Sequence, residues 1–251
     1  MDAELLTAIE TELTAEKPAM LATIIDRAGS APRGVGTSMV VTTSGAQVGT
    51  VGGGSMEYHV RQDALALLND RICEIRTYGI HSDSSGYSSG SVTILFRPFS
   101  GEAGLALCKQ LREAMESGQD AYLVSQLLET CASESSLLSK DALCAACGID
   151  CIPEEATVTG GESRWLIEPI QPAPRVILFG GGHVAQCMAR QLELLEYRIW
   201  IAEDREVFAK QELFPMAERV LLCEYTSLQP LLNVTNSVNA IVMSRSNETD
   251  E

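Results

Sequence analysis

The sequence predicts an α/β protein in two parts: an N-terminal mixed α+β domain over residues 1–170, then a Rossmann-like parallel α/β domain over residues 171–251 that is truncated. Three observations support this prediction. Strand and helix patterns are mixed in the first part, and the proline-rich segment 169–174 interrupts regular structure. From Arg175 onward, short apolar strands alternate with helical segments, which is typical of a parallel sheet with right-handed crossovers.

In the first part, residues 3–13 predict a helix whose leucine and isoleucine residues fall on one face, with Asp2 as its N-cap. A second helix is opened by Gly52–Ser55 and runs to Leu68, and a third covers residues 103–117. A polar, cysteine-bearing insertion precedes the last strand, and no internal repeat is evident in the sequence. The predicted strands are Ala19–Ile25, Ser38–Thr42, Gln47–Val51, Ile72–Tyr78, Ser91–Arg97, Tyr122–Leu128 and Arg164–Ile170.

In the second part, the elements alternate in the order expected of a doubly wound sheet. The unbroken apolar run Val176–Phe179 predicts a buried strand, because both faces of a parallel sheet are normally covered. The other predicted elements are the helices Val184–Leu195 and Val207–Leu213 and the strands Arg198–Ala202, Val220–Leu222 and Ala240–Met243.

Composition excludes several classes of protein. The chain has 34 acidic and 18 basic residues and a formal charge of −16, with no basic run, so it does not suit nucleic acid. No apolar run is long enough to span a bilayer. The N-terminus has neither a basic nor an apolar segment of a secretory signal, which predicts a cytoplasmic protein.

A glycine motif follows the first strand of the second part. Residues 179–185 read Phe-Gly-Gly-Gly-His-Val-Ala, which fits Gly-x-Gly-x-x-Ala between a buried strand and a helix. We expect Gly180 and Gly182 to admit a pyrophosphate at the helix N-terminus, with His183 as a polar contact. Asp204 stands 24 positions after Gly180, where such folds place an acid that holds a ribose. The alternatives are a packing turn that binds nothing and a histidine that only caps the helix.

A second glycine loop lies in the first part. Gly52, Gly53, Gly54 and Ser55 follow a strand and open a helix, so their amides and the helix dipole favour an anion. The loop lacks the Gly-Lys-Ser/Thr ending of a P-loop, which argues against ATP hydrolysis. Glu57 in the first helical turn could bind a donor group of a ligand, or it could cap its own helix.

Arg33 stands in a third glycine-rich segment, Gly29–Gly36. Its guanidinium could form a bidentate contact with a phosphate, and the surrounding glycines would let the backbone approach a ligand closely. The alternative is a surface arginine with no ligand.

The cysteines carry the remaining candidate site. Cys144, Cys147 and Cys151 could hold zinc or an iron–sulfur cluster if a fourth ligand were supplied, and Cys131 could supply it. Neither a second cysteine pair nor a nearby histidine completes the pattern, so we interpret the eight cysteines as plain thiols and predict no metal site.

Taken together, the ordered motifs resemble the XdhC/CoxI family over nearly the whole chain. The resemblance rests on three sets of residues. They are Gly29-Ser30-Ala31-Pro32-Arg33 with Gly36 and Met39, then Gly49-Thr50-Val51-Gly52-Gly53-Gly54 with Glu57, and Phe179-Gly180-Gly181-Gly182-His183-Val184-Ala185 with Asp204-Arg205 and Phe214-Pro215.

The resemblance implies an accessory protein that binds the molybdenum cofactor, as molybdopterin or its dinucleotide form, and assists its sulfuration and insertion. It implies a molybdenum hydroxylase apoenzyme, of the xanthine dehydrogenase type, as partner, with a cysteine desulfurase as a second partner. Such a protein is a cofactor chaperone rather than a catalyst, and no catalytic residue is assigned. The alternative, from the glycine motif and Asp204, is an NAD(P)-dependent oxidoreductase.

Two departures from the family pattern bear on these expectations. The chain reads Ser88-Ser89-Gly90 where the family usually has Cys-Gly-Gly, which removes a thiol that could handle sulfur or molybdenum. The sequence ends soon after the fourth Rossmann strand, whereas family members continue. Because an uncovered parallel sheet invites pairing with another chain, we expect a homodimer.

Overall fold

A computed structural model of the chain describes residues 1–31, 33–81, 88–117, 120–161, 163–170, 174–195, 197–225 and 238–243. It divides the chain into two units, Met1–Gln171 and Pro172–Glu251. Within the described residues, no helix is both long and apolar enough to cross a membrane.

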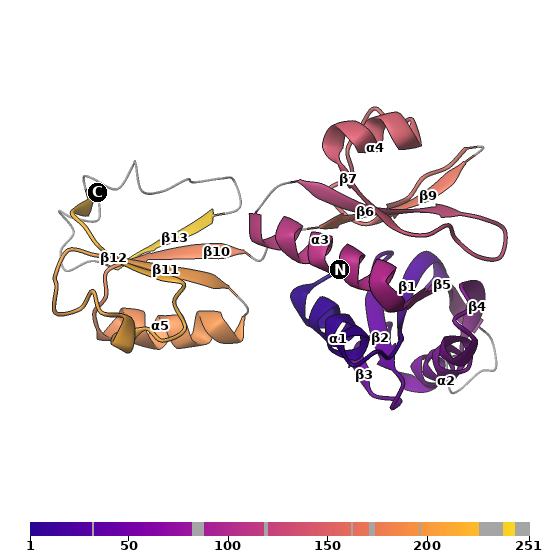
Figure 1. Ribbon diagram of the computed structural model, residues 1–251, viewed down its shortest axis with the longest axis horizontal. Helices are drawn as coiled ribbons and strands as arrows, with labels where there is room; N and C mark the ends of the chain where they lie inside the picture. The colour runs from indigo at the N-terminus through magenta and orange to yellow at the C-terminus, as the bar shows by residue number, and fades with distance from the viewer. Residues whose placement is uncertain are drawn as a thin grey trace. The chain divides into compact units, whose positions relative to one another are not determined.

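The first half of the first unit is a five-stranded antiparallel sheet with two helices (Figure 1). Asp2 caps the first helix by accepting a hydrogen bond from the Leu5 amide (2.9 Å), as predicted. The sheet has the order β3-β2-β1-β5-β4. The elements are α1 (Ala3–Thr14), β1 (Ala19–Gly29), β2 (Ser38–Thr42), β3 (Gln47–Gly49), α2 (Gly54–Asp70), β4 (Glu74–His81) and β5 (Ser88–Phe99).

The second half of this unit is a four-stranded antiparallel sheet of order β7-β6-β9-β8. The segment that we interpreted as an insertion contains regular structure, namely β7, α4 and β8. Its strands are only two and four residues long, which is too short for a clear alternation of apolar residues in the sequence. The elements are α3 (Gly101–Ser117), β6 (Ala121–Leu127), β7 (Ser136–Ser139), α4 (Lys140–Cys147), β8 (Thr157–Val158) and β9 (Arg164–Ile170).

The two halves repeat one architecture, although the sequence shows no evident repeat. The order β2-β1-β5-β4 matches β7-β6-β9-β8, and each half begins with a helix before its central strand. The pairing registers agree as well: Ala19 lies opposite Phe99, and Ala121 lies opposite Ile170. The helices α1 and α3 pack against each other (Figure 1) and share an ion pair between Glu10 and Arg112.

A buried ion pair joins the two halves. Arg97 of β5 and Glu168 of β9 occupy matching positions in the two registers, opposite Leu21 and Leu123. Their side chains are 4% and 1% exposed, and Arg97 Nη1 lies 2.6 Å from Glu168 Oε2. Arg97 Nη2 also donates to the Thr23 hydroxyl at 2.9 Å. A charged contact therefore fixes the two sheets to each other at the centre of the unit.

The second unit is a parallel sheet of order β12-β11-β10-β13, which is third-second-first-fourth along the chain. This order is that of a Rossmann fold and confirms the predicted fold class. One face of the sheet packs on α5 through Val176, Leu178, Ala185 and Ala189. The elements are β10 (Arg175–Phe179), α5 (His183–Leu194), β11 (Arg198–Glu203), β12 (Arg219–Leu222) and β13 (Val238–Val242).

The prediction of a helix over Val207–Leu213 is wrong. The structure has turns at residues 205–209, where the Phe208 and Ala209 amides both donate to the Arg205 carbonyl at 3.0 Å, then a short 3-10 helix, Gln211–Leu213. The Arg205 guanidinium stacks 4.3 Å from the centroid of the Phe208 ring, and this contact stabilises the turn instead of a helix.

Removing one member of the buried ion pair should destabilise the first unit strongly. We expect Arg97→Met or Glu168→Leu alone to lower its free energy of unfolding by about 3–5 kcal/mol, since the partner charge stays buried and unpaired. The double variant should regain most of this loss. Urea unfolding, followed by the fluorescence of Trp165 in a Trp200→Phe background, measures the free energy of unfolding of the first unit.

The control removes Lys109 from its exposed pair with Glu113, where Lys109→Met should change stability by less than about 0.5 kcal/mol. A double variant as unstable as both single variants combined would contradict a coupled buried pair.

Candidate functional site

Both N-terminal glycine segments lie at one edge of the first sheet. β1 ends at Gly29, β2 begins at Ser38, and β3, antiparallel to β2, ends at Gly49 beside Met39. β5 begins at this edge too, where Gly90 lies opposite Gly29. We call residues 29–31, 33–36, 50–54 and 90 the glycine edge. The fold thus places at one end of the sheet motifs that are up to 61 positions apart in the sequence.

The carboxylate of Glu57 occupies the centre of the second glycine loop. Its Oε2 accepts hydrogen bonds from the amides of Val51 (3.0 Å), Gly52 (3.3 Å) and Gly53 (3.1 Å), and from the Thr50 hydroxyl. Gln47 donates to Oε1 at 2.9 Å. Successive amides that converge on one point form an anion site, and here the anion is part of the protein.

The hydrogen bonds decide the protonation state of Glu57. Partial burial would raise the pKa of its carboxyl group, but the bonds from Thr50, Gln47, Gly53 and Val51 outweigh burial and lower it. Glu57 therefore stays ionised at neutral pH, and its charge stabilises the loop and the N-terminus of α2.

The amides of Gly52 and Gly53 thus already donate to the Glu57 carboxylate. The amides left for an anion are those of the next residues, Gly54 and Ser55, in the first turn of α2. α2 has Gly53 as N-cap without a side-chain cap, and Gly54 and Ser55 are exposed. Gly53 has φ of 84°, which favours glycine, while a Cβ there would meet no atom within 4 Å. The first-turn amides of α2 consequently face open space, where a phosphate could approach.

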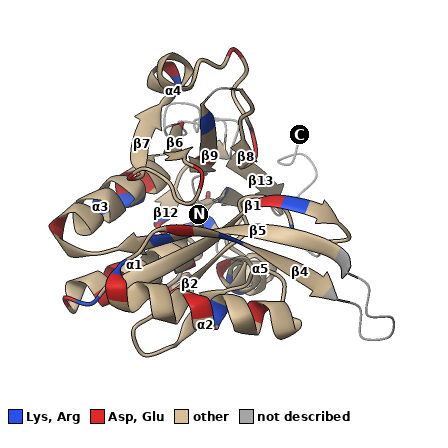
Figure 2. Cartoon of the chain, turned by 90° about the vertical axis from the view of Figure 1, so that its right-hand side faces the viewer, with Lys and Arg blue, Asp and Glu red and all other residues tan. Residues whose placement is uncertain are grey.

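Arg33 is the cation of the glycine edge. It is exposed, and no ion pair or side-chain hydrogen bond to it occurs in the described parts of the chain. Ser88, which replaces the family cysteine, pairs with His81 in the ladder between β5 and β4, and its side chain lies outside the described residues. On the faces seen in Figure 2, α2 and α3 carry both basic and acidic residues and the charged residues of α1 are all acidic, so these helices form no basic patch.

The Rossmann loop of the second unit follows β10. Gly180 has φ of 111°, and its amide donates to the Ala202 carbonyl at 2.8 Å. Gly182 is the N-cap of α5 without a side-chain cap. His183 is exposed at the first position of α5, with its ring 6.4 Å from the Phe208 ring. Glycines and histidine thus lie at a helix N-terminus, as the motif predicts.

The acid that reaches this loop is Glu203, which the sequence analysis did not single out. Glu203 ends β11, its side chain is 0% exposed, and it accepts a hydrogen bond from the Gly181 amide. Arg205 Nε donates to the same carboxylate at 2.7 Å. Asp204 instead lies 3.6 Å from Arg205 Nε. Its position could have pointed to this role, because Glu203 is the first acidic residue after the apolar run of β11.

Glu203 is strongly acidic. Burial alone would raise the pKa of its carboxyl group, but hydrogen bonds from Arg205 and the Gly181 amide lower it to about 2. The Gly181 amide, one of the donors that could cradle a pyrophosphate, is therefore committed to an internal carboxylate. A dinucleotide of any kind would therefore find one backbone donor fewer in this loop.

The cysteines do not assemble into a metal centre in the described part of the chain. Cys144 and Cys147 lie on α4, and Cys151 is exposed beyond it. The described residues contain no group of three or more His, Cys, Asp or Glu side chains that could hold a metal ion.

The internal anion of the first loop makes stability depend on pH. We expect Glu57→Gln to lower the free energy of unfolding by about 2 kcal/mol at pH 7. The folded pKa is below the ordinary 4.5, so the charged form stabilises the fold above that pH, and the contribution is lost as the pH falls through the folded pKa. Urea unfolding of both proteins at several pH values should show the difference shrinking in acid. A difference that is constant with pH would contradict this role of the charge.

Two adjacent glycines of the Rossmann loop should respond differently to alanine. A Cβ on Gly181 would lie 2.9 Å from the Phe208 carbonyl oxygen, whereas one on Gly182 would meet no atom within 4 Å. We expect Gly181→Ala to lower the melting temperature of the second unit by several degrees and Gly182→Ala to leave it unchanged. Calorimetry measures the melting temperature of both variants. Equal effects would mean that Glu203 and Phe208 do not close on this loop.

Comparisons with known proteins identify the family of the chain. The profile of the XdhC and CoxI family matches residues 13–79, and that of the XdhC Rossmann domain matches residues 176–251. Among solved structures, a Bacillus halodurans protein described as a xanthine dehydrogenase matches with a TM-score of 0.77 and 17% identity. The match covers 98% of this chain and 76% of that one, and at this identity it shows the fold alone. No curated protein matches the sequence. From the two profile matches, together with the motifs at the glycine edge and the Rossmann loop, we conclude that the chain belongs to the XdhC/CoxI family.

Proposed function

We propose that this chain is an accessory protein that binds the molybdenum cofactor and assists its sulfuration and its insertion into a hydroxylase of the xanthine dehydrogenase type. Membership of the XdhC/CoxI family supports the coarser statement, an accessory role in the maturation of a molybdenum hydroxylase. Binding of the cofactor itself is the more specific part of the proposal, and the geometry of the glycine edge is the observation that supports it.

The glycine edge suits the phosphate end of the cofactor. The first-turn amides of α2, at Gly54 and Ser55, are exposed and uncapped by any side chain. A helix N-terminus of this kind binds phosphate through its amides and its dipole. Arg33, on the same edge, would supply the counter-charge that a protein of formal charge −16 otherwise lacks.

Glu57 acts in this proposal by positioning the loop. Its carboxylate holds the amides of Val51, Gly52 and Gly53, so the loop keeps its shape before any ligand arrives. A preorganised loop loses less conformational entropy on binding, and this strengthens binding. The bound cofactor would supply the redox chemistry of the client hydroxylase, while this chain's residues bind and orient it.

The thiols bear on sulfuration. Burial raises the pKa of Cys73, Cys147 and Cys223, and that of Cys108 to about 12, so all four remain protonated near neutral pH. Protonated thiols are poor nucleophiles and poor sulfur carriers. With Ser88 in place of the family cysteine, we propose that sulfur comes from a partner, a cysteine desulfurase, while this chain holds the cofactor.

The second unit takes part in the same process through its Rossmann loop. The first-turn amides of α5, at Gly182 and His183, would bind the second phosphate of a dinucleotide form, and Asp204 would contact its ribose. The oxidoreductase alternative is not favoured, because both family matches are to XdhC families.

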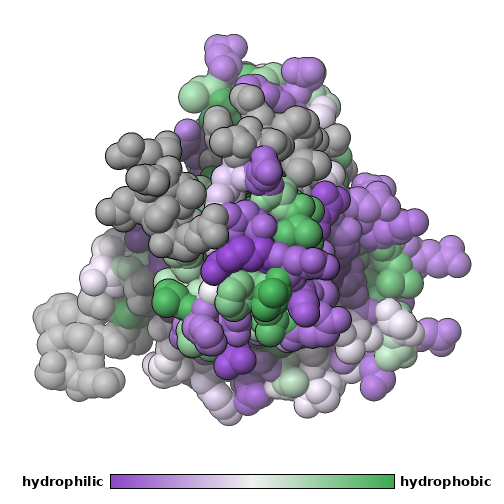
Figure 3. Space-filling model, turned by 90° about the vertical axis from the view of Figure 1, so that its left-hand side faces the viewer, coloured by the Kyte–Doolittle hydropathy of each residue, from purple (hydrophilic) through white to green (hydrophobic). Residues whose placement is uncertain are grey.

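We also propose a homodimer. Large apolar side chains of the second unit are exposed, among them Val184 (67%), Leu194 (76%) and Leu195 (65%). Figure 3 shows separate apolar patches among hydrophilic groups on one face. Burying such side chains against a second copy would remove apolar surface from water. Light scattering at micromolar concentration that gives the mass of one chain would contradict the dimer.

Cofactor content tests the proposal. We expect protein purified from molybdate-fed cells to carry molybdenum and pterin, measured by mass spectrometry of the metal and fluorescence of the oxidised pterin. Arg33→Gln should lower this content about tenfold, because a phosphate loses its charged partner. Arg164→Gln is the matched control, since Arg164 is an exposed arginine of β9 outside the glycine edge.

Two outcomes would contradict the assignment. Wild-type protein without pterin would remove the chaperone function. Equal cofactor content in Arg33→Gln and Arg164→Gln would remove the glycine edge as the phosphate site, while leaving the accessory role in place.

A further inference from the structure

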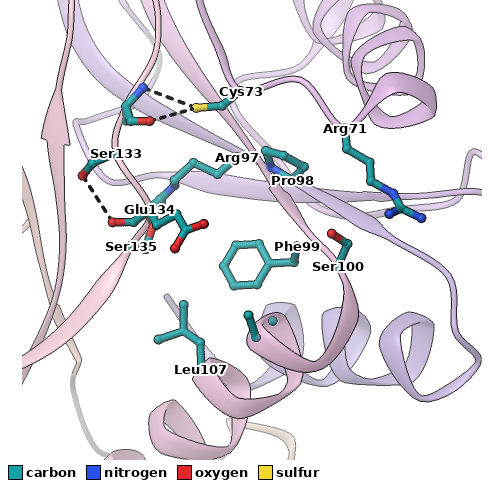
Figure 4. Close-up of a pocket in the computed structure, with 13 residues that line it drawn as sticks. Arg71, Cys73, Arg97, Pro98, Phe99, Ser100, Leu107, Ser133, Glu134 and Ser135 are labelled. Atoms are coloured by element: carbon teal, nitrogen blue, oxygen red, sulfur yellow. Dashed lines mark hydrogen bonds between the residues drawn. The ribbon is translucent and has the colours of Figure 1, made fainter.

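A pocket of about 340 Å³ lies at the far end of β5 from the glycine edge (Figure 4). β5 starts beside the glycine edge at Gly90, and the pocket begins at Arg97, where β5 leads into α3. The volume is within the range of sites for small molecules. The cofactor proposal does not use this pocket, so a role for it is independent of that proposal.

Apolar groups form one wall of the pocket and charged groups stand on opposite sides of it. Pro98, Phe99 and Leu107 supply the apolar wall. In Figure 4, Arg71 and Glu134 lie on either side of Phe99, one cation and one anion. Both charged residues are exposed, so each can reach a ligand that enters from solvent.

Neither charge is neutralised by the protein. Over the described ranges, the side chains of Arg71 and Glu134 make no ion pair or hydrogen bond. A plain anion would be repelled by Glu134, and a plain cation by Arg71. A molecule that carries both charges satisfies both residues, with its apolar body against Phe99 and Leu107.

The segment that carries Glu134 is held in a fixed position. The Ser135 hydroxyl lies 2.8 Å from that of Ser125 and accepts a hydrogen bond from Arg97 Nη1 at 3.4 Å. Arg97 is itself fixed by Glu168. The Cys73 thiol accepts from the Ala132 amide at 3.3 Å, and burial raises its pKa, so it is a neutral wall group rather than a nucleophile. The pocket therefore suits reversible binding without a covalent step.

The internal repeat gives this segment a counterpart. The connection from β6 to β7 contains residues 128–135 and corresponds to the connection from β1 to β2, which carries Arg33. In each half, this connection contacts the outer strands of the other half. The Ile75 amide donates to the Thr130 carbonyl at 2.8 Å, and a Cβ on Gly36 would touch Ala156 next to β8. One architecture thus places a polar loop against the other half twice.

We propose that this pocket binds a small zwitterion of the α-amino-acid class with an apolar side chain, its carboxylate on Arg71 and its ammonium group on Glu134. Ser100 also lines the pocket, and the Ser133 hydroxyl, which accepts from the Gln126 amide and donates to the Glu134 carbonyl, holds the segment that carries Glu134. The apolar side chain of the ligand lies against Phe99 and Leu107.

Nuclear magnetic resonance titration of the full chain with L-leucine, L-methionine and L-phenylalanine tests the proposal. We expect at least one of them to bind at millimolar or lower concentration. Its amide, which lacks the carboxylate, and its N-acetyl derivative, which lacks the ammonium group, should each bind about fivefold more weakly. Equal binding of the N-acetyl derivative would overturn the zwitterion in favour of a simple anion, and no binding by all three amino acids would overturn the site.

Variants locate the site. Ala103→Phe, which fills the pocket from the exposed first turn of α3, should weaken binding at least tenfold, and Ala106→Phe on the same helix should not. Arg71→Asp and Glu134→Lys should each weaken binding about fivefold, and the double variant should restore it, because the zwitterion can turn around. Asp is chosen at position 71 since Arg71 has a φ of 54°, which Asp tolerates. Binding that survives Ala103→Phe, or a double variant no better than the single ones, would overturn the assignment.

Discussion

The ion pair between Arg97 and Glu168 is the contact on which the first unit depends. Both charges are almost completely buried, so each lost its hydration on folding. Among the described residues, Arg97 gains the hydroxyl of Thr23 besides its partner, whereas Glu168 is compensated by the charge of Arg97. Because the two residues occupy the same position in two repeated halves, the halves are complementary in charge. Two copies of the first half would place arginine against arginine. The pair therefore favours the association of the two different halves within one chain.

Both glycine loops contain an anion that belongs to the protein. Glu57 holds the amides of the first loop, and Glu203 holds the Gly181 amide of the second. In each case hydrogen bonds outweigh the cost of burial and keep the carboxylate ionised. A glycine loop thus does not by itself make a vacant phosphate site. What remains for a ligand is the first turn of the helix that follows, at Gly54 in α2 and at Gly182 in α5.

The repeated architecture connects the two candidate binding sites of the first unit. The connection between the first two strands of each half is long and polar, and in each half it lies against the other half. In the first half it carries Arg33 and the glycine edge, while in the second half it carries Glu134 and lines the pocket. The packing of the halves, through α1, α3 and the central ion pair, keeps the sheets in place. The connections are then free to differ in chemistry.

The sequence by itself determined the family, the Rossmann-like parallel character of the second unit and most of the strands, because these follow from local apolar patterns and glycine motifs. It also directed attention to the loop at Gly52–Ser55, since glycine marks unusual backbone conformations, while the role of this loop and of Arg33 in binding a ligand stays a prediction. Only the tertiary structure decided that Glu57 and Glu203 close onto their own loops, that residues 205–209 form turns instead of a helix, and that Arg97 meets Glu168. Each of these contacts joins atoms that lie close in space, and the separation of the two residues along the sequence does not mark them as partners. The repeat was hidden for the same reason: it lies in the strand order and the pairing register, which bring together residues that are far apart in the sequence.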